Sequence, residues 1–301
     1  MKMNTVLILG KGYIGKYLSV YLKQHNFDVY HLSKRDVDYT NPELLEQKIR
    51  QYNSTYHGRV DWVINCSGFT GTPNVDGCED YKEDCYKFNV LVPLYITKVC
   101  NSLFIPIIHI SSGCIYNGYD KIYTEQDISD FGADCFDSSF YSKTKDCFEK
   151  LSAHMDRYLF RIRIPFNGVY EPKNYLYKIT NYNNLISKQN SITCVDDLVC
   201  FIKKFIEQKH RIDYGAYNVV NEGSVDSFDL VDMLKAKGVN NKKWNFVSTQ
   251  EANFRVCRSN CILSTDKIKS IGLGLPNVKE SLFRAVDEFS KQWIKINKKD
   301  K

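Results

Sequence analysis

Two short segments hold residue types that could together reduce a carbonyl group. Ser111 and Ser112 follow an apolar run at 105–110, and Tyr141 and Lys145 lie four residues apart in a predicted helix. This spacing places the phenol and the ammonium on one helical face. A ketone that accepts a hydride becomes an alkoxide and needs a proton, which a tyrosine with a pKa lowered by the ammonium could supply. Ser112 could hydrogen-bond the carbonyl oxygen and orient it.

A glycine-rich turn near the start of the chain predicts the site of the hydride donor. The apolar run 5–9 predicts a strand buried on both faces, and it leads into the pattern GxGxxG and a helix over about 14–25. The three glycines permit a tight turn, the approach of a pyrophosphate and close packing of helix on strand. Lys145 could hold the nicotinamide ribose. We expect the turn to contact the cofactor through Gly10, Gly12, Tyr13, Ile14 and Gly15.

The second predicted strand, at 28–32, ends in a serine followed by two cations. Folds of this type that prefer NADH usually place a carboxylate there, on the ribose 2′-hydroxyl. A hydroxyl and two cations suit a 2′-phosphate instead, so NADPH is the predicted cofactor; the alternative is a solvated turn. The segment 36–43 predicts a short further strand, and Thr40 or Asn41 could cap the helix that follows it to about Gln51. We expect the adenosine end of the cofactor to lie near Ser33, Lys34, Arg35 and Asp38.

The next strand, predicted at 60–65, breaks into Cys66, Ser67 and Gly68. Side chains this small would let the diphosphate and ribose of the cofactor pass close to the backbone. The polar loop 72–79 directly follows this cofactor-binding strand. Loops in this position commonly carry function, so we expect this one to touch substrate.

Composition excludes several classes of protein. The 301 residues are 43% hydrophobic, enough for one large α/β domain or two lobes, and the net charge of +6 is spread along the chain rather than gathered for nucleic acid. No apolar run approaches the about 20 residues that span a bilayer. The eleven cysteines form no CxxC pair, and no leader segment opens the chain. We therefore expect a cytoplasmic protein without a metal site.

The alternation of strands and helices predicts an α/β fold, a Rossmann-type doubly wound parallel sheet with a smaller α/β substrate lobe. We place the NADP-binding domain at 1–166, with 191–221 returning to it. The substrate-binding lobe is placed at 167–190 and 222–301. A strand at 216–220 should rejoin the main sheet, so the two lobes interleave in sequence.

The chain resembles the extended short-chain dehydrogenase/reductases that act on nucleotide sugars. Segments 29–43 and 111–116 resemble the dTDP-4-dehydrorhamnose reductases, and 112–116 is also similar to GDP-fucose synthase. A narrower resemblance is to the bifunctional UDP-4-keto-6-deoxyglucose 3,5-epimerase/4-reductase of rhamnose synthesis. It runs from Val6 to about Phe289, and it rests on segments 68–79, 139–145, 161–165 and 172–180.

This resemblance implies NADPH-dependent 3,5-epimerisation and 4-keto reduction of UDP-4-keto-6-deoxy-D-glucose to UDP-L-rhamnose. Cys114 lies two residues beyond Ser112, where its thiolate could remove the acidic proton beside a 4-ketone. By similarity, Lys178 is the second acid-base group, where GDP-fucose synthase uses a histidine. A packed cysteine and an exposed lysine are the alternative interpretations. Substrate contacts are expected from Thr70, Asn74, Ser112, Asn174 and Arg258, the last on the sugar diphosphate.

Other functions stay open at this point. A GDP-sugar epimerase/reductase or a plain nucleotide-sugar 4-reductase would share most of these residues. A non-catalytic NADP-binding regulatory subunit is the alternative of a different class. The UDP-rhamnose interpretation implies a separate UDP-glucose 4,6-dehydratase upstream, and a homodimer is possible.

Overall fold

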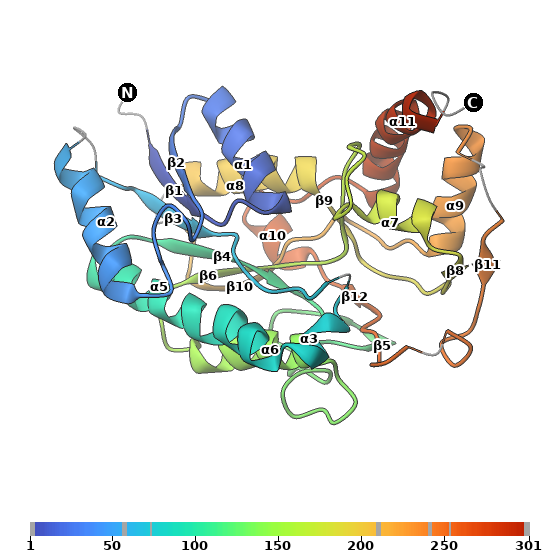
Figure 1. The fold of residues 1–301 in the computed structure, drawn as a ribbon, viewed down its shortest axis with the longest axis horizontal. Coiled ribbons are helices and arrows are strands. Elements are labelled where there is room, and N and C mark those ends of the chain that lie inside the picture. Colours follow the sequence, from blue (N-terminus) through green and yellow to red (C-terminus); the bar gives the residue numbers. More distant parts are fainter. Residues whose placement is uncertain are drawn as a thin grey trace.

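Six parallel strands form the central sheet of the protein (Figure 1). The computed structural model describes residues 4–55, 59–72, 74–208, 212–239, 243–252 and 254–297. Across the sheet the strands are β2 (Asp28–Leu32), β1 (Thr5–Leu9), β3 (Trp62–Asn65), β4 (Ile107–Ser112), β6 (Tyr158–Ile162) and β10 (Gly215–Asn218). The strand order reverses between β1 and β3, and open α/β sheets bind ligands at such a switch point. The predicted doubly wound α/β fold is confirmed.

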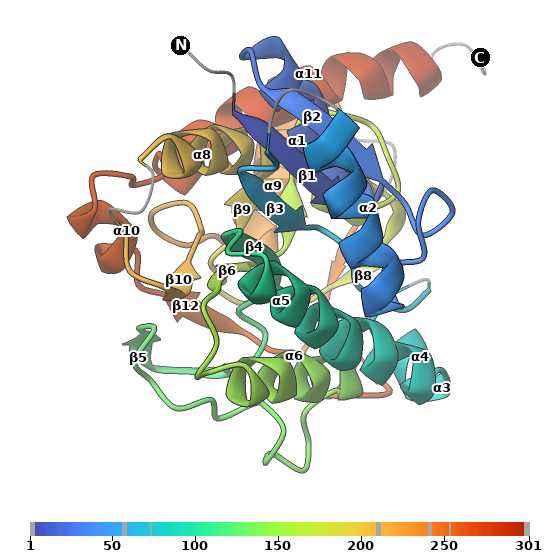
Figure 2. The ribbon, with the colours of Figure 1, turned by 90° about the vertical axis from the view of Figure 1, so that its left-hand side faces the viewer.

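Helices cover both faces of this sheet, which explains why its strands are apolar without alternation (Figure 2). One face carries α1 (Tyr13–Gln24) and α8 (Val195–Glu207), which pack on Val6 and Ile8 of β1. The other face carries α2 (Pro42–Thr55), α5 (Val92–Ser102) and α6 (Phe140–Leu151). Leu7 and Leu9 of β1 point to that second face. The sheet therefore presents its carboxyl edge, and not its faces, to ligands.

A second apolar core lies to one side of the sheet, at the right of Figure 1. It is enclosed by α7 (Tyr175–Asn181), α9 (Ser227–Ala236) and α11 (Val278–Asn297), and Phe166, Leu230 and Phe289 are buried in it. Short parallel pairs border this core: β7 (Pro165–Phe166) with β9 (Thr193–Cys194), and β8 (Asn184–Leu185) with β11 (Asn245–Phe246). The chain enters, leaves and re-enters this second lobe; the domain limits given above stay a prediction.

The remaining short elements line the carboxyl edge of the sheet or support it. The loop after β3 contains α3 (Gly77–Asp80) and α4 (Lys82–Tyr86), and a π-helix, Lys87–Leu91, joins α4 to α5. Strand β5 (Gly118–Tyr123) pairs with β12 (Cys261–Leu263), and α10 (Asp266–Ser270) follows β12. No helix in the described part of the chain has the length and apolarity needed to cross a membrane.

The short strand predicted within 36–43 is wrong. Local hydrogen bonds turn this segment instead: Asp38 Oδ1 accepts from the Thr40 N–H at 3.2 Å, and Asn41 Oδ1 accepts from the Leu44 N–H at 3.0 Å. Asp and Asn side chains compete with a strand ladder in this way. The second of these bonds starts α2, so the segment serves as a helix cap rather than as a sheet edge.

Candidate active site

The turn after β1 forms a cradle for a phosphate group. Gly10 has φ +102°, and a Cβ there would lie 2.7 Å from the Ser67 nitrogen; one on Gly15 would overlap the Gly10 carbonyl. A Cβ on Gly12 would meet no described atom within 4 Å. No side chain among the described residues caps α1, which begins at Tyr13, so its first N–H groups face this open space. Such a helix start suits the pyrophosphate of a dinucleotide.

Tyr13 and Ile14 occupy the first turn of α1 and are partly buried. The Tyr13 hydroxyl donates to Asn167 Oδ1 at 2.9 Å, which links this turn to the start of the second lobe. Asn167 is 1% exposed, and its Nδ2 has no partner among the described residues. Asn167 was not among the predicted site residues, and its position just after β7 is the only signal that the sequence holds for it.

The end of β2 differs from expectation, because a carboxylate does lie there. The N–H and the hydroxyl of Ser33 both donate to Asp36 Oδ2 at 2.7 Å. Lys34 and Arg35 are exposed, and Lys34 Nζ lies 5.3 Å from the ring centroid of Phe88. Asp38 is committed to Thr40 as described above. The two cations therefore remain available to a phosphorylated ligand, whereas Ser33 is already engaged.

A buried hydrogen-bond chain fixes the end of β3. Ser67 donates from its N–H and hydroxyl to Asn65 Oδ1, at 3.0 and 2.5 Å. The Asn65 amide bonds His109 Nδ1 at 3.0 Å, and His109 Nε2 bonds the Thr97 hydroxyl at 2.9 Å. Burial lowers the pKa of His109, so this histidine is a neutral link and not a base. Cys66 lies at the same strand end, where burial raises the pKa of its thiol to about 12.

Asn89 holds the loop that follows Gly68. Its amide oxygen accepts from the Phe69 N–H at 2.9 Å, and its Nδ2 donates to the Phe69 carbonyl at 2.8 Å and to the Thr144 hydroxyl at 3.2 Å. Asn89 lies in the π-helix, and single π turns of this kind often mark functional sites. A helical pattern in sequence does not reveal such a turn.

The structure brings Ser112, Cys114, Tyr141 and Lys145 together at the carboxyl end of β4. The Ser112 hydroxyl lies close enough to the phenol of Tyr141 to act on its pKa, and it accepts from the Cys114 N–H at 3.3 Å. Lys145 Nζ lies 5.5 Å from the ring centroid of Tyr141 and 3.6 Å from the position of a Cβ built on Gly68. The phenol of Tyr141, the thiol of Cys114 and Gly68 at the end of β3 thus lie in one site.

The pKa of Tyr141 is raised, which corrects the expectation that Lys145 lowers it. Burial is the main cause, the nearby Cys114 adds to it, and the Ser112 hydroxyl opposes it. Burial also lowers the pKa of Lys145, while Cys114, Cys85 and then Glu149 act to raise it. Tyr141 is therefore protonated at neutral pH, the state that an acid requires.

The thiol of Cys114 is partly buried, and burial raises its pKa. Hydrogen bonds from Ser112 and Ser142 oppose this shift, as do the positive charges of Arg163 and Lys145. The environment thus contains the groups that favour a thiolate, although burial outweighs them.

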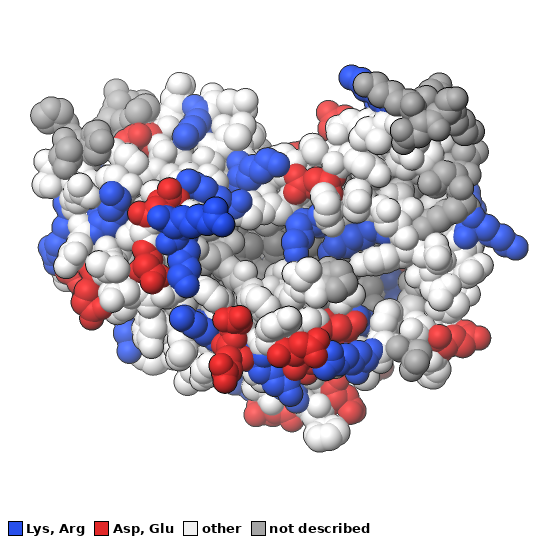
Figure 3. All heavy atoms as spheres, in the orientation of Figure 1, with Lys and Arg blue, Asp and Glu red and all other residues white. Residues whose placement is uncertain are grey.

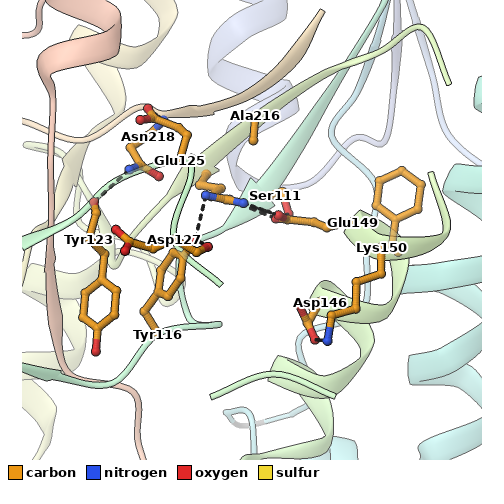
Figure 4. A network of polar contacts seen from close by, with 12 residues as sticks. Ser111, Tyr116, Tyr123, Glu125, Asp127, Asp146, Glu149, Lys150, Ala216 and Asn218 are labelled. Carbon is orange, nitrogen blue, oxygen red and sulfur yellow. Dashed lines mark hydrogen bonds and ion pairs between the residues drawn. The ribbon is translucent and has the colours of Figure 1, made fainter. Parts of the chain in front are cut away.

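Glu149, one helical turn after Lys145 on α6, forms a buried ion pair with Arg161. Figure 4 shows Glu149 and the polar groups around it. Glu149 accepts from Arg161 Nε at 3.2 and 3.0 Å and from Nη2 at 2.6 Å. Arg161 Nη1 donates to the Tyr116 hydroxyl at 3.0 Å, and Ser111 Oγ lies 3.4 Å from Glu149. This network ties α6, which carries Tyr141 and Lys145, to strands β4 and β6. Neither Glu149 nor Arg161 was among the predicted site residues.

The residues expected to bind substrate are distributed over both lobes. Thr70 is exposed in the loop after β3, and Asn74 Oδ1 in the same loop accepts from the Asp76 N–H at 2.8 Å. Arg258 Nη2 donates to Asp76 at 2.7 Å. Arg258 Nη1 and Asp76 Oδ1 are buried and have no partner in the described part of the chain. The loop and the segment around Arg258 thus meet across the site.

Asn174 has a structural role instead of the predicted contact with substrate. Its side chain is fully buried, its Oδ1 accepts from the Leu176 N–H at 3.1 Å as the cap of α7, and its Nδ2 donates to the carbonyls of Asn167 and Val169. No donor or acceptor is left for a sugar. Lys178, on the same helix, is half-buried, and burial followed by the charge of Lys173 lowers its pKa.

The molecular surface is hollowed between the two lobes (Figure 3). Lys and Arg side chains border this hollow on both sides in that view. A concave site with cations at its rim suits a ligand that carries phosphate groups.

This fold and site define a class of protein, the extended α/β dehydrogenase/reductases. Residues 3–291 match the family model described as RmlD substrate binding domain, and the chain belongs to this family. A bifunctional dTDP-4-dehydrorhamnose 3,5-epimerase/dTDP-4-dehydrorhamnose reductase of Arabidopsis thaliana is 31% identical over 242 residues, which cover 76% of this chain and 77% of that protein. The chain therefore belongs to a family that includes enzymes.

Other relatives are longer or share the fold alone. A trifunctional UDP-glucose 4,6-dehydratase/UDP-4-keto-6-deoxy-D-glucose 3,5-epimerase/UDP-4-keto-L-rhamnose-reductase of Arabidopsis thaliana is 32% identical over 76% of this chain, which spans only 35% of that relative. The L780 UDP-rhamnose synthase of Acanthamoeba polyphaga mimivirus matches with a TM-score of 0.84 and 24% identity, over 95% of this chain and all of that one. A dTDP-4-dehydrorhamnose reductase of Bacillus anthracis, solved with NADP, matches with a TM-score of 0.79 and 20% identity, over 97% of this chain and all of that one.

Proposed function

We propose that the enzyme epimerises UDP-4-keto-6-deoxy-D-glucose at C3 and C5 and then reduces C4 with NADPH to give UDP-L-rhamnose. The observation that carries this proposal is the meeting of Ser112, Cys114, Tyr141 and Lys145 in one site. Ser112, Tyr141 and Lys145 are the parts of a carbonyl reductase. The thiol adds a group that reduction alone does not require.

The residues after β1 and β3 fit a dinucleotide. The open space at Gly12, the uncapped start of α1 and the small residues after β3 leave room and donors for a diphosphate. NADPH, when bound, supplies the hydride. Lys34 and Arg35 provide positive charge at the end of β2, which favours the phosphorylated form of the cofactor.

In the reduction, Ser112 holds the C4 carbonyl oxygen by a hydrogen bond from its hydroxyl. As C4 gains the hydride, the oxygen becomes an alkoxide and takes the phenolic proton of Tyr141. The ammonium of Lys145 stabilises the resulting phenolate through the low-dielectric surroundings. The raised pKa of Tyr141 keeps this donor loaded at neutral pH before each turnover.

In the epimerisation, the Cys114 thiolate removes the proton on the carbon beside the ketone. The electrons move to the C4 oxygen to form an enolate, which the Ser112 hydroxyl stabilises. Lys178 then returns a proton to the opposite face of that carbon. The lowered pKa of Lys178 makes its ammonium a better donor near neutral pH than an ordinary lysine.

Proton exchange followed by NMR in deuterated water tests both activities. Purified protein is incubated with UDP-4-keto-6-deoxy-D-glucose, first without and then with NADPH. We expect deuterium to enter C3 and C5 without cofactor, and UDP-L-rhamnose to form when NADPH is added. Cys114→Ala is expected to abolish the exchange, whereas Tyr141→Phe should exchange but not reduce. Exchange that persists unchanged in Cys114→Ala would contradict the role of the thiol.

A plain nucleotide-sugar 4-reductase is the second candidate. It is favoured by the burial of Cys114, which raises the pKa of the thiol that must act as a base. Reduction of an already epimerised 4-keto-rhamnose nucleotide, without exchange at C3 and C5, would identify it. Parallel assays with UDP-, dTDP- and GDP-sugars establish which nucleotide the substrate carries. We further propose that a separate UDP-glucose 4,6-dehydratase supplies the substrate.

A further inference from the structure

An ion pair joins the glycine-rich turn to the end of β2. Asp36 Oδ2 accepts from the Ser33 N–H and hydroxyl, at 2.7 Å each, and lies 2.8 Å from the ammonium of Lys11. Lys11 stands between Gly10 and Gly12, and the Gly10 N–H bonds the Leu32 carbonyl at 2.7 Å, so the two strand ends are neighbours. One carboxylate oxygen thus receives three donors from two separate segments.

These three donors are the kind that bind a phosphate group. An ammonium, a hydroxyl and a backbone N–H make charge-assisted hydrogen bonds to phosphate oxygens, as they do here to a carboxylate. In folds of this class the ribose 2′ position of the dinucleotide lies beside the residues that end the second strand. The carboxylate of Asp36 therefore occupies the place that a 2′-phosphate would take.

We propose that Asp36 is an intramolecular occupant of the 2′-phosphate site and that it sets the balance between NADPH and NADH. This inference rests on the cofactor named in the proposed function. In the free enzyme Asp36 neutralises Lys11 and engages Ser33. A 2′-phosphate must displace this carboxylate, and repulsion between the two anions weakens NADPH binding. NADH, with a hydroxyl at that position, meets no such repulsion.

The surroundings limit the size of the effect. The side chains of Lys11 and Asp36 are 47% and 38% exposed, so water and salt screen their attraction. Lys34 and Arg35 are exposed and remain free to approach the phosphate once Asp36 has turned away. Asp38 carries a second negative charge nearby, but its carboxylate faces Thr40. Asp36 thus weakens the binding of NADPH without preventing it.

Binding titrations test this without turnover. Wild-type protein, Asp36→Asn and Lys11→Met are titrated calorimetrically with NADPH, NADH, adenosine 2′,5′-bisphosphate and 5′-AMP. We expect Asp36→Asn to bind NADPH and the bisphosphate about fivefold tighter at low salt, with NADH and 5′-AMP within about twofold of wild type. Lys11→Met should weaken the binding of NADPH by about tenfold and leave the binding of NADH unchanged. Glu46→Gln, an equal charge change on the exposed face of α2, is the matched control.

Three results would overturn the inference. Weaker NADH binding by Asp36→Asn, with no gain for NADPH, would make Asp36 the acceptor of a ribose 2′-hydroxyl. Equal affinities of Asp36→Asn and Glu46→Gln for NADPH would show that the carboxylate of Asp36 does not compete with the 2′-phosphate. Wild-type protein that binds neither dinucleotide would remove the cofactor from the proposed function and this inference with it. Binding of NADPH without sugar chemistry, by contrast, would contradict only the proposed reaction.

Discussion

Removal of the carboxylate of Glu149 should unpair a buried charge. Glu149→Gln keeps the shape of the side chain but leaves Arg161 without a counter-ion. The two side chains are 9% and 7% exposed, so water cannot replace the lost charge. Breaking a buried ion pair from one side typically costs about 3–5 kcal/mol. The glutamine oxygen still accepts one hydrogen bond, so we expect a loss of about 3 kcal/mol in the free energy of unfolding.

Urea denaturation followed by tryptophan fluorescence measures this loss. The control is the double variant Glu149→Leu with Arg161→Met, which removes both charges and fills much of the same volume. Because it leaves no charge unpaired, we expect it to be more stable than Glu149→Gln by at least about 1 kcal/mol. A double variant as unstable as the single one would refute this reasoning, since an unpaired charge could not then be the cause of the lost stability.

The same substitution should change the chemistry of the site in a way that stability alone does not. Glu149 acts to raise the pKa of Lys145, against the burial that lowers it. Without Glu149 the pKa of Lys145 falls further, so the alkaline limb of the pH-rate profile for reduction moves to lower pH. The double variant lacks the same carboxylate and should show the same shift despite its greater stability. An unshifted profile in both variants would confine Glu149 to a structural role.

Three further outcomes are expected. Tyr141→Phe should slow reduction by at least about 100-fold because it lacks the transferable proton, with NADPH affinity unchanged in a fluorescence titration; unchanged turnover would contradict its role. Deuterium exchange at C3 and C5 should quicken by about tenfold per pH unit from neutral pH upward, because burial raises the pKa of Cys114 and the thiolate forms only at alkaline pH; a rate independent of pH would point to another base. Phe104→Gly should raise the free energy of unfolding by about 1 kcal/mol, because Phe104 has φ +54° and is 87% exposed; a loss in urea denaturation would refute the strain.

The parts of the fold that follow simple patterns were predictable. Continuous apolar runs gave strands β1, β3 and β4, and the glycine spacing gave the turn that leads into α1. Strand β6 does not stand out in the same way, because Arg161 interrupts its apolar run. That arginine is neutralised in its buried strand by Glu149, which lies on another element. Pairings of this kind are set by the assembled fold, so a local pattern cannot reveal them.

The site was predictable to the same extent. Ser112, Tyr141 and Lys145 were selected by chemical type and spacing, and the structure brings them together. The pKa of Tyr141 was not predictable, because it depends on burial rather than on the neighbouring cation. Asn174 and Asp36 show a related limit. Each has a polar side chain that could bind a ligand, and each is also engaged by groups farther along the chain: Asn174 by the carbonyls of Asn167 and Val169, and Asp36 by Lys11.

The hydrogen bond between Tyr13 and Asn167 makes the two halves of the site interdependent. Tyr13 shares the first turn of α1 with the N–H groups that face the phosphate cradle, and its partner lies where the second lobe begins. A movement of the first turn of α1 would therefore shift Asn167 at the start of the second lobe. A cofactor and a sugar bound on the two sides of this hydrogen bond would then share a coupling free energy, and thermodynamic linkage would require each to change the affinity for the other by the same factor.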